Sequence, residues 1–455
     1  MELSGDPDVR SAYSRDASGL ELIPELVSRP GSEDEVADTI RELAAKGSSI
    51  TPAGSQTSMT GSSITDSGTL MSMMSMNRII DIDPVRRIAR VEPGARIGDL
   101  NRALAEHGLL FAPDPTSEND ATVGGAIACN ASGARTLHYG STRNHVTAVR
   151  VAHADGSVKS YNRAHPEKNC VGYWMVQDPV DWFVGSEGTL GIVVEAELSL
   201  VDLPRATVGL AIPFRDLESS LGFIVGARGS SRSPLCLELF DDRAMQIAAE
   251  SSGRQWPEDA RALIYLEDDA LDQSLIEEVL SHWLEIGEIF HAITGDIRVY
   301  QGSSELRDAR TMRHAVPVTM NERGAKFRAS GGRKVSTDWA VPYARLGDAL
   351  RESAAAIKGH SAPEPVTYGH AGNGHPHQNF IAEDAGALAR VNAAVHETLQ
   401  RIIAMGGTVS AEHGLGKIKR QWLALQLSPT QIGVMRQIKH ALDPHNVFAP
   451  GNIFE

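Results

Sequence analysis

Three stretches rich in glycine, serine and threonine lie within the first 200 residues and constrain the fold more than any other feature of the chain. They are PAGSQTSMTGSS at 52–63, TVGGAIACNASGARTLHYGSTRN at 122–144 and GSEGTLGI at 185–192. Glycine allows a backbone to approach a ligand closely, and backbone N–H groups and hydroxyls can hold a phosphate. Each stretch alone could be a polar surface loop. Three together predict a cofactor site in this part of the chain.

The segments between these stretches predict alternating helices and strands. Residues 32–46 form an amphipathic pattern, with Ser32 and Glu35 as a capping box and Gly47 as the stop. Asp155-Gly156, between two alternating apolar runs, predicts a hairpin with a two-residue turn. Further predicted elements are strands at 79–83, 87–92, 191–200 and 262–267, and helices at 97–107, at 385–404 and from Ser428-Pro429 to Asp443-Pro444.

The length of 455 residues exceeds what one compact core holds, so more than one domain is expected. The pattern breaks at VDLPRA, residues 201–206, where we place a domain boundary. The predicted division is 1–203, 204–415 and a C-terminal helical segment at 416–455 that packs back on the first domain.

The formal net charge of −15 argues against nucleic acid and against docking on anionic membranes as functions. Cys129, Cys170 and Cys236 lie far apart, so neither a disulfide framework nor a thiolate metal site is indicated. No signal peptide and no apolar stretch of membrane-spanning length is found. We therefore expect a cytoplasmic protein. The sequence contains neither GxGxxG nor GxxxxGK[ST], which weakens the nicotinamide and ATP interpretations.

A second cluster of motifs lies in YGHAGNGHPHQN, residues 368–379, and SAEHGLGK, residues 410–417. Imidazoles and carboxylates of this kind suit a divalent metal, and a set of three ligands would leave positions for a substrate. The alternative is a turn-rich loop whose histidines face solvent. The candidate residues are His370, His375, His377, Glu412 and His413.

Basic residues could anchor an anionic substrate, although most such residues are solvated surface charges. The candidates are Arg310 and Arg313 in RDARTMRHAVP and Lys334 in GGRKVSTDWAVP. Only a guanidinium held rigidly would give bidentate recognition of a carboxylate.

Taken in order, these motifs resemble the vanillyl-alcohol-oxidase-type flavoproteins over nearly the whole chain, and within them the D-lactate, D-2-hydroxyglutarate and glycolate dehydrogenase branch. The matching segments are PDPTSENDATVGGAIACNASGARTLHYGSTRNHV, GSEGTLGI and DPHNVFAPGNIF. The loop at 52–63 occupies the place of the pyrophosphate loop, with Ser55, Gln56 and Ser58 where the family has other small residues. The resemblance implies an α+β fold, with a two-subdomain FAD-binding part and a substrate (cap) domain of antiparallel sheet and helices.

The resemblance also implies which residues hold FAD. Because residues 52–64 contain no histidine, the FAD is expected to be non-covalent. The implied cofactor-binding residues are Pro52, Ala53, Gly54, Ser55, Gln56, Thr57, Ser58, Pro115, Thr122, Gly124, Gly125, Ala128, Asn130, Ser132, Gly133, Tyr139, Gly140, Glu187, Gly188, Gly191, Ile192 and Asn452.

The family's metal motif, GHxGDGNxH, is similar to residues 369–377, where Asn373 and His375 stand in place of Asp and Asn. The resemblance implies His370, His377 and Glu412 as metal ligands, with Zn or Mn as the expected ion. It places His375 in the pocket lining, with an altered ligand set as the alternative. His413 is then the catalytic base, Arg313 the carboxylate anchor and Lys334 a further catalytic candidate.

The implied reaction is FAD-dependent oxidation of a small anionic D-2-hydroxy acid, of the D-lactate or D-2-hydroxyglutarate type, by hydride transfer to flavin N5. The alternatives are a non-redox FAD-dependent transferase of the same fold, a metal-dependent hydrolase, and a non-catalytic subunit of a larger complex. The electron acceptor stays open between quinone, cytochrome, electron-transferring flavoprotein, oxygen and dye. A homodimer and a peripheral association with the inner membrane also stay open.

Overall fold

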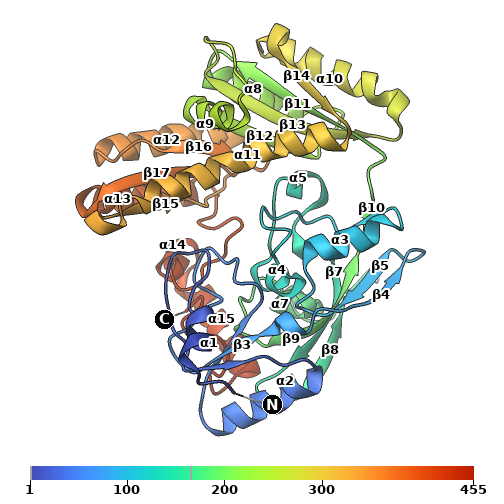
Figure 1. Cartoon of the computed structure of the whole chain (residues 1–455), viewed down its shortest axis with the longest axis vertical. Helices are drawn as coiled ribbons and strands as arrows, with labels where there is room; N and C mark the ends of the chain where they lie inside the picture. The colour runs from blue at the N-terminus through green and yellow to red at the C-terminus, as the bar shows by residue number, and fades with distance from the viewer. Residues whose placement is uncertain (1–2, 164–166, 455) are drawn as a thin grey trace. The chain divides into compact units, whose positions relative to one another are not determined.

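The computed structural model describes residues 3–163 and 167–454 and confirms an α+β fold (Figure 1). The chain divides into two compact units. The first consists of Met1–Gly133, Gly140–Leu203 and Glu412–Glu455, and the second of Ala134–Tyr139 and Pro204–Ala411. Two short pieces therefore differ from the predicted division: residues 134–139 join the second unit, and residues 412–415 join the first.

The first unit contains two main sheets. A parallel sheet has the order β1 (Leu26–Ser28), β3 (Thr69–Ser72), β2 (Ile50–Ala53). An antiparallel sheet has the order β4 (Ile79–Asp83), β5 (Ile88–Val91), β9 (Ile192–Ser199), β7 (Val146–Ala152), β8 (Val158–Asn162). The helices are α1 (Pro7–Ala12), α2 (Glu33–Ala45), α3 (Ile97–Ala105), α4 (Val123–Cys129), α6 (Trp174–Gln177), α7 (Val180–Phe183), α14 (Leu423–Gln426) and α15 (Pro429–Leu442). Strands β6 (Leu109–Leu110) and β10 (Val201–Asp202) form a short antiparallel pair.

The first unit has two apolar cores, one on the antiparallel sheet and one that joins the parallel sheet to residues of β7 and β9. Residues of α3 and α4, among them Leu100 and Ile127, are buried with the inward side chains of the antiparallel sheet. The parallel sheet shares a core with α2 and with Phe448 from the C-terminal segment. Residues 416–455 belong to this unit, and the predicted domains stay predictions.

The second unit is built on one antiparallel sheet of seven strands. Its order is β14 (Arg298–Gln301), β11 (Ala206–Phe214), β13 (Ala262–Ala270), β12 (Cys236–Asp241), β16 (Val366–Gly369), β17 (His377–Asp384), β15 (Gly331–Ser336). Its helices are α5 (Thr136–Tyr139), α8 (Leu217–Arg228), α9 (Asp242–Ser252), α10 (Ile276–Ile289), α11 (Gly302–Ala325), α12 (Leu346–Gly359) and α13 (Ala385–Ala404). Buried side chains of α9 and α11 share an apolar core with strands of this sheet.

Two local predictions are wrong in detail. The Ser32 hydroxyl does cap α2 by accepting from the Glu35 N–H, but the Glu35 carboxylate accepts from the Gly31 N–H and not from Ser32, so the reciprocal box is absent. The hairpin between β7 and β8 has a three-residue loop and not a two-residue one. The His153 N–H donates to the Ser157 carbonyl, and Gly156 has φ +72°. A residue in this left-handed conformation is typical of a three-residue hairpin loop.

Candidate functional site

The three glycine-rich stretches converge in the first unit. A Cβ added at Gly54 would lie 2.2 Å from Thr122 Oγ1, and one added at Gly188 would lie 2.6 Å from Pro52 Cγ. The Glu187 N–H donates to the Ala128 carbonyl at 2.8 Å. The end of β2 and the loop after it therefore contact the start of α4 and the loop before β9. A side chain at Gly54 or Gly188 would collide with these neighbours.

The loop at 54–59 has unused donors, as a phosphate-binding loop requires. The Ser55 hydroxyl is buried and has no hydrogen-bond partner among the described residues. Within that part of the chain, the backbone N–H groups of residues 55–59 also have no acceptor. A buried polar group without a partner is costly, and a ligand oxygen would satisfy it. These residues therefore fit the pyrophosphate of a dinucleotide such as FAD. The Gln56 amide, by contrast, donates to the Tyr13 carbonyl within the protein.

The second stretch is held in a fixed conformation. The Thr122 hydroxyl caps α4 by accepting from the Gly125 N–H, and Asn130 ends the helix with φ +50°. A Cβ at Gly124 would lie 2.6 Å from Pro93 Cβ, and one at Gly133 would lie 2.1 Å from the Asp114 carbonyl oxygen. The predicted residues Pro115, Ala128 and Ser132 belong to the same part of the chain, and Gly140 has φ +81°. Gly124 and Gly133 are required by close packing against Pro93 and the Asp114 backbone, and Gly140 by its positive φ.

Two predicted cofactor residues use their side chains to brace loops. The Glu187 carboxylate accepts from the N–H groups of Leu415 and Gly416, and burial raises its pKa. The Asn452 amide donates to the carbonyls of Ser62 and Glu187 and accepts from Lys417 Nζ at 2.7 Å. Their contribution to cofactor binding stays a prediction. The backbones of Gly191 and Ile192 begin β9 behind this loop.

Tyr139 belongs to the second unit, because α5 is part of that unit, whereas the other predicted cofactor residues belong to the first. There, Arg135 lies 3.5 Å from the buried carboxylate of Glu267. A Cβ at Gly372, in the loop after β16, would lie 2.7 Å from Leu137 Cδ2. The segment 134–139 therefore packs against the histidine-containing loop of the second unit.

The β16–β17 hairpin brings the predicted metal ligands together. His370 follows the last residue of β16, and His377 is the first residue of β17, opposite Tyr368. The His375 N–H donates to the His370 carbonyl at 3.1 Å, which closes the turn. Gly374 has φ +69°, and a Cβ there would lie 2.0 Å from the Val341 carbonyl oxygen, so the turn requires glycine at this position.

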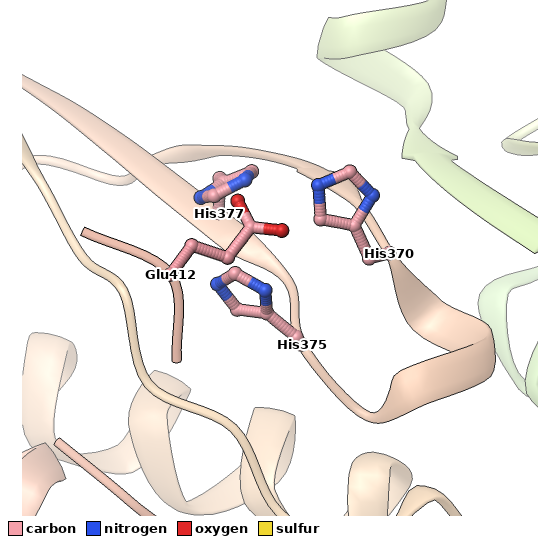
Figure 2. A group of neighbouring side chains, drawn as sticks. All are labelled: His370, His375, His377 and Glu412. Carbon is pink, nitrogen blue, oxygen red and sulfur yellow. The ribbon is translucent and has the colours of Figure 1, made fainter. Parts of the chain in front are cut away.

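Four side chains form one group that could hold a metal ion: His370, His375, His377 and Glu412 (Figure 2). One ligand atom from each lies within 4.8 Å of the corresponding atom of every other. Glu412 directly follows Ala411, whose N–H donates to the Asp338 carbonyl at 2.8 Å. The donors are imidazole nitrogens and a carboxylate, which fit a divalent transition metal.

A buried carboxylate that the sequence analysis missed lies behind His370. Glu238, in β12, is 0% exposed, and its Oε1 lies 2.7 Å from His370 Nδ1. Its Oε2 lies 3.0 Å from Nε of the buried Arg313, in α11. A carboxylate on one ring nitrogen of a histidine fixes the ring and its tautomer, as is usual for metal ligands. The sequence signal for Glu238 was one acidic residue within the otherwise apolar segment CLELF, residues 236–240.

A second missed carboxylate, Asp338, lies behind His375. Asp338 is 1% exposed, and its Oδ1 lies 3.2 Å from His375 Nε2. Its Oδ2 accepts from the Ser410 hydroxyl at 2.6 Å. Two of the three clustered histidines therefore have a buried carboxylate on one ring nitrogen.

The other predicted catalytic residues lie in different surroundings. Lys334, in β15 opposite Ile381, is half-buried, and burial lowers its pKa to about 8. Because side chains alternate along a strand, it lies on the same face of the sheet as Asn379 and His377. Arg310 forms a two-pronged pair with buried Glu267. His413 is half-buried, and its carbonyl accepts from the Thr60 hydroxyl; its catalytic role stays a prediction.

The cysteines are free thiols: Cys236 is buried, Cys129 half-buried and Cys170 exposed. Burial raises the pKa of Cys129 to about 12. No helix among the described residues is both long enough and apolar enough to cross a membrane.

Comparison with protein families finds two matches. The family described as FAD linked oxidases, C-terminal domain, matches residues 203–453, and the FAD binding domain matches residues 24–162. The second match contains the loops at 52–63 and 122–144, and the first contains the histidine group.

Among curated proteins, the chain is 29% identical to the glycolate oxidase subunit GlcD of Bacillus subtilis (strain 168), covering 98% of this chain and 92% of that protein. It is 29% identical to a D-lactate dehydrogenase of Archaeoglobus fulgidus, covering 94% and 91%. It is 28% identical to a D-2-hydroxyglutarate dehydrogenase of Stutzerimonas stutzeri, covering 99% and 95%. A solved structure of alkyldihydroxyacetonephosphate synthase has a similar fold, with a TM-score of 0.73 at 17% identity over 98% of this chain and 82% of that one.

Proposed function

Because the chain belongs to the family of FAD-linked oxidases, we propose that it oxidises a small D-2-hydroxy acid to the 2-oxo acid with non-covalent FAD and a divalent metal. The observation that carries this proposal is the pairing, in one chain, of converging glycine-rich loops with a group of three histidines and a glutamate. Relatives of nearly the same length are named for D-lactate, D-2-hydroxyglutarate and glycolate, which supports the substrate class.

Bound FAD would supply a hydride acceptor and a bound divalent metal a Lewis acid for the substrate oxygens. The residues of the loops at 52–58, 122–140 and 187–192 would hold the FAD, with Ser55 as a donor to its phosphates. His370, His377 and Glu412 would hold the metal, Zn or Mn in the first instance.

The remaining residues would bind and orient the substrate. Arg313 would bind the substrate carboxylate, and Glu238 would hold the guanidinium in a fixed orientation. His413 would accept the proton of the 2-hydroxyl. Lys334, whose pKa burial lowers to about 8, would add positive charge on the same face of the sheet as His377. These groups would favour an anion in a chain of net charge −15.

Two other activities use parts of the same site. A transferase without net oxidation is suggested by the synthase of similar fold, but that likeness extends to the fold alone. A metal-dependent hydrolase could use the histidine group, but it would leave the glycine-rich loops without a role. The electron acceptor, a homodimeric state and a cytoplasmic or peripheral membrane location are further proposals that the substrate experiment does not address.

The test is the visible spectrum of the purified protein, followed by anaerobic addition of D-lactate, D-2-hydroxyglutarate, glycolate and the L-forms. We expect flavin absorption bands that bleach with a D-acid and not with its L-form. Flavin bands that bleach with none of these acids would overturn the substrate class. A colourless protein that cannot be reconstituted with FAD would overturn the redox reaction and favour the hydrolase.

A further inference from the structure

We propose that His375 is a fourth protein ligand of the metal and that Asp338 holds it in place. The site would then contain three imidazoles and one carboxylate. The proposal rests on the metal-assisted function above, and it adds a ligand to the set of His370, His377 and Glu412. In the GHxGDGNxH motif, asparagine is usual at the position of His375, so this ligand would distinguish the chain from that motif.

The three rings have the mutual spacing that a shared ion requires. Their centroids are 4.6 Å apart for His375 and His377, 5.3 Å for His370 and His377, and 5.4 Å for His370 and His375. An imidazole nitrogen lies about 2.1 Å from a bound metal, which places each ring centroid roughly 3.2 Å from the ion. Ligand angles of about 90–115° then give centroid separations of roughly 4.5–5.4 Å. By this criterion His375 is as well placed as the other two histidines.

Asp338 lies beside one of the two nitrogens of the His375 ring. Nε2 is 3.2 Å from Asp338 Oδ1, an ion-pair distance, and if Asp338 holds that nitrogen, Nδ1 would face the ion. His370 has the reverse arrangement, with Nδ1 on Glu238 and Nε2 for the ion. Both carboxylates are buried, and Asp338 is itself fixed by the Ser410 hydroxyl and by the Ala411 N–H on its carbonyl.

A four-ligand set affects which coordination number the metal needs. A 2-hydroxy acid that chelates through its hydroxyl and carboxylate would occupy two further positions, for a total of six. Zinc in proteins is mostly four-coordinate, whereas manganese and iron accept octahedral sites. Binding of the hydroxy acid would therefore reduce the advantage that Zn²⁺ has over Mn²⁺, Fe²⁺ and Co²⁺ at nitrogen and oxygen ligands.

The first experiment uses the wild-type, FAD-loaded chain. X-ray absorption of the protein loaded with one equivalent of Co²⁺ counts the imidazoles on the ion. We expect three, and a count of two would overturn the proposal even if no variant folds. Failure of the wild-type chain to bind Co²⁺, Mn²⁺ or Zn²⁺ in competition with a chelator would overturn both this proposal and the metal in the proposed function. A count of two would leave that function intact.

The second experiment measures Co²⁺ affinity by chelator competition for His375→Asn, which restores the motif residue. We expect a loss of at least about 100-fold and an altered Co²⁺ absorption spectrum, and about 10-fold for Asp338→Asn. In the double variant the Asp338 substitution should add little. The matched control is His360→Asn, because His360 also pairs with a carboxylate, Glu397, outside the group. Wild-type affinity and spectrum in His375→Asn, with flavin bands intact, would overturn the proposal.

Discussion

The two candidate sites are built from different chemical groups. The loops at 52–63, 122–144 and 185–192 are rich in glycine, and at many of these glycines an added Cβ would collide with neighbouring backbone or side chains. The second site groups three histidine side chains with Glu412, and a buried carboxylate lies behind two of the histidines. The comparison teaches that the first site is sensitive to added atoms, whereas the second is sensitive to removed functional groups. The predictions below test this contrast, beginning with the largest effect.

Removing one ligand should abolish the reaction without removing the cofactor. His377→Ala deletes an imidazole of the group, and losing several kcal/mol of charge stabilisation corresponds to a fall in kcat of at least about 10³-fold. Because the FAD loops lie elsewhere in the chain, the flavin absorbance per protein should be unchanged. Steady-state turnover and the visible spectrum measure the two effects. Turnover like that of the wild type would contradict a metal role for this group.

Substitution of two buried glutamates of the second unit would distinguish an effect on metal binding from an effect on stability. Glu238 pairs with Arg313 and His370, whereas Glu267 pairs with Arg310. Glu238→Gln leaves the buried Arg313 guanidinium without its counter-charge and should lower the free energy of unfolding by about 3–5 kcal/mol. Glu267→Gln should lower it by less, because the Arg310 side chain is 35% exposed and water can solvate its charge. Glu238→Gln alone should also weaken metal binding by about 10–100-fold.

Urea unfolding and chelator competition would measure these two quantities for both variants. An equal loss of metal affinity in Glu267→Gln would show that the effect passes through general destabilisation, and the contrast between the two sites would then fail.

Adding one methyl group should damage the first site. In Gly124→Ala the new Cβ would lie 2.6 Å from Pro93 Cβ and 2.9 Å from the Pro93 carbonyl oxygen. Such overpacking costs about 1–3 kcal/mol and should reduce the FAD content of the purified protein. Metal affinity should not change. The control is Gly433→Ala in α15, where no atom lies within 4 Å and a gain of about 0.5–1 kcal/mol is expected.

Two half-buried lysines, one in each unit, give the comparison with the smallest expected effect. Burial lowers the pKa of both Lys334 and Lys417 to about 8 from 10.5. A lowered lysine pKa means that folding buries a charge below pH 8. This destabilisation is fully present there and is relieved as the pH rises from about 8 to 10.5.

The lysines differ in their partners, so their substitutions should have opposite signs at pH 7. Lys417 Nζ donates to Asn452 Oδ1 and to the Gly61 carbonyl, whereas Lys334 Nζ has no partner among the described residues. Lys334→Met should stabilise by about 1 kcal/mol, and Lys417→Met should destabilise by about 1 kcal/mol. Urea unfolding between pH 7 and 10 would measure both. Destabilisation by Lys334→Met would indicate a partner that fixes its ammonium group.

Local sequence patterns correctly predicted helices whose ends are set by residues within one turn. The helices at 385–404 and from Ser428 to Asp443 begin and end at the expected residues, because caps and stops act within one turn. The hairpin turn was wrong because Asp155-Gly156 is compatible with two loop lengths. The choice depends on the pairing of the whole strands, in which Ala152 opposes Val158.

The sequence patterns could not predict which buried carboxylates lie beside the histidines, because these residues are far apart in the chain. Glu238 and Asp338 lie 132 and 37 residues from the histidines that they support, and neither belongs to a motif. The group of His370, His377 and Glu412 could be proposed from residue type and resemblance, and the structure brings these residues together with His375. The bracing side chains of Glu187 and Asn452 could not be distinguished from cofactor contacts, because both roles require a polar residue beside a glycine-rich loop.

The late chain segment that completes the first unit has a consequence for biosynthesis. The Ile50 N–H donates to the Val447 carbonyl, the Ala449 N–H donates to the Ile50 carbonyl, and Phe448 between them is 0% exposed. We therefore expect β2 to stay unpaired on this side during translation until these residues leave the ribosome. The second unit ends at Ala411, so we expect it to be able to fold earlier. This order would differ from the usual N-terminal-first folding of domains.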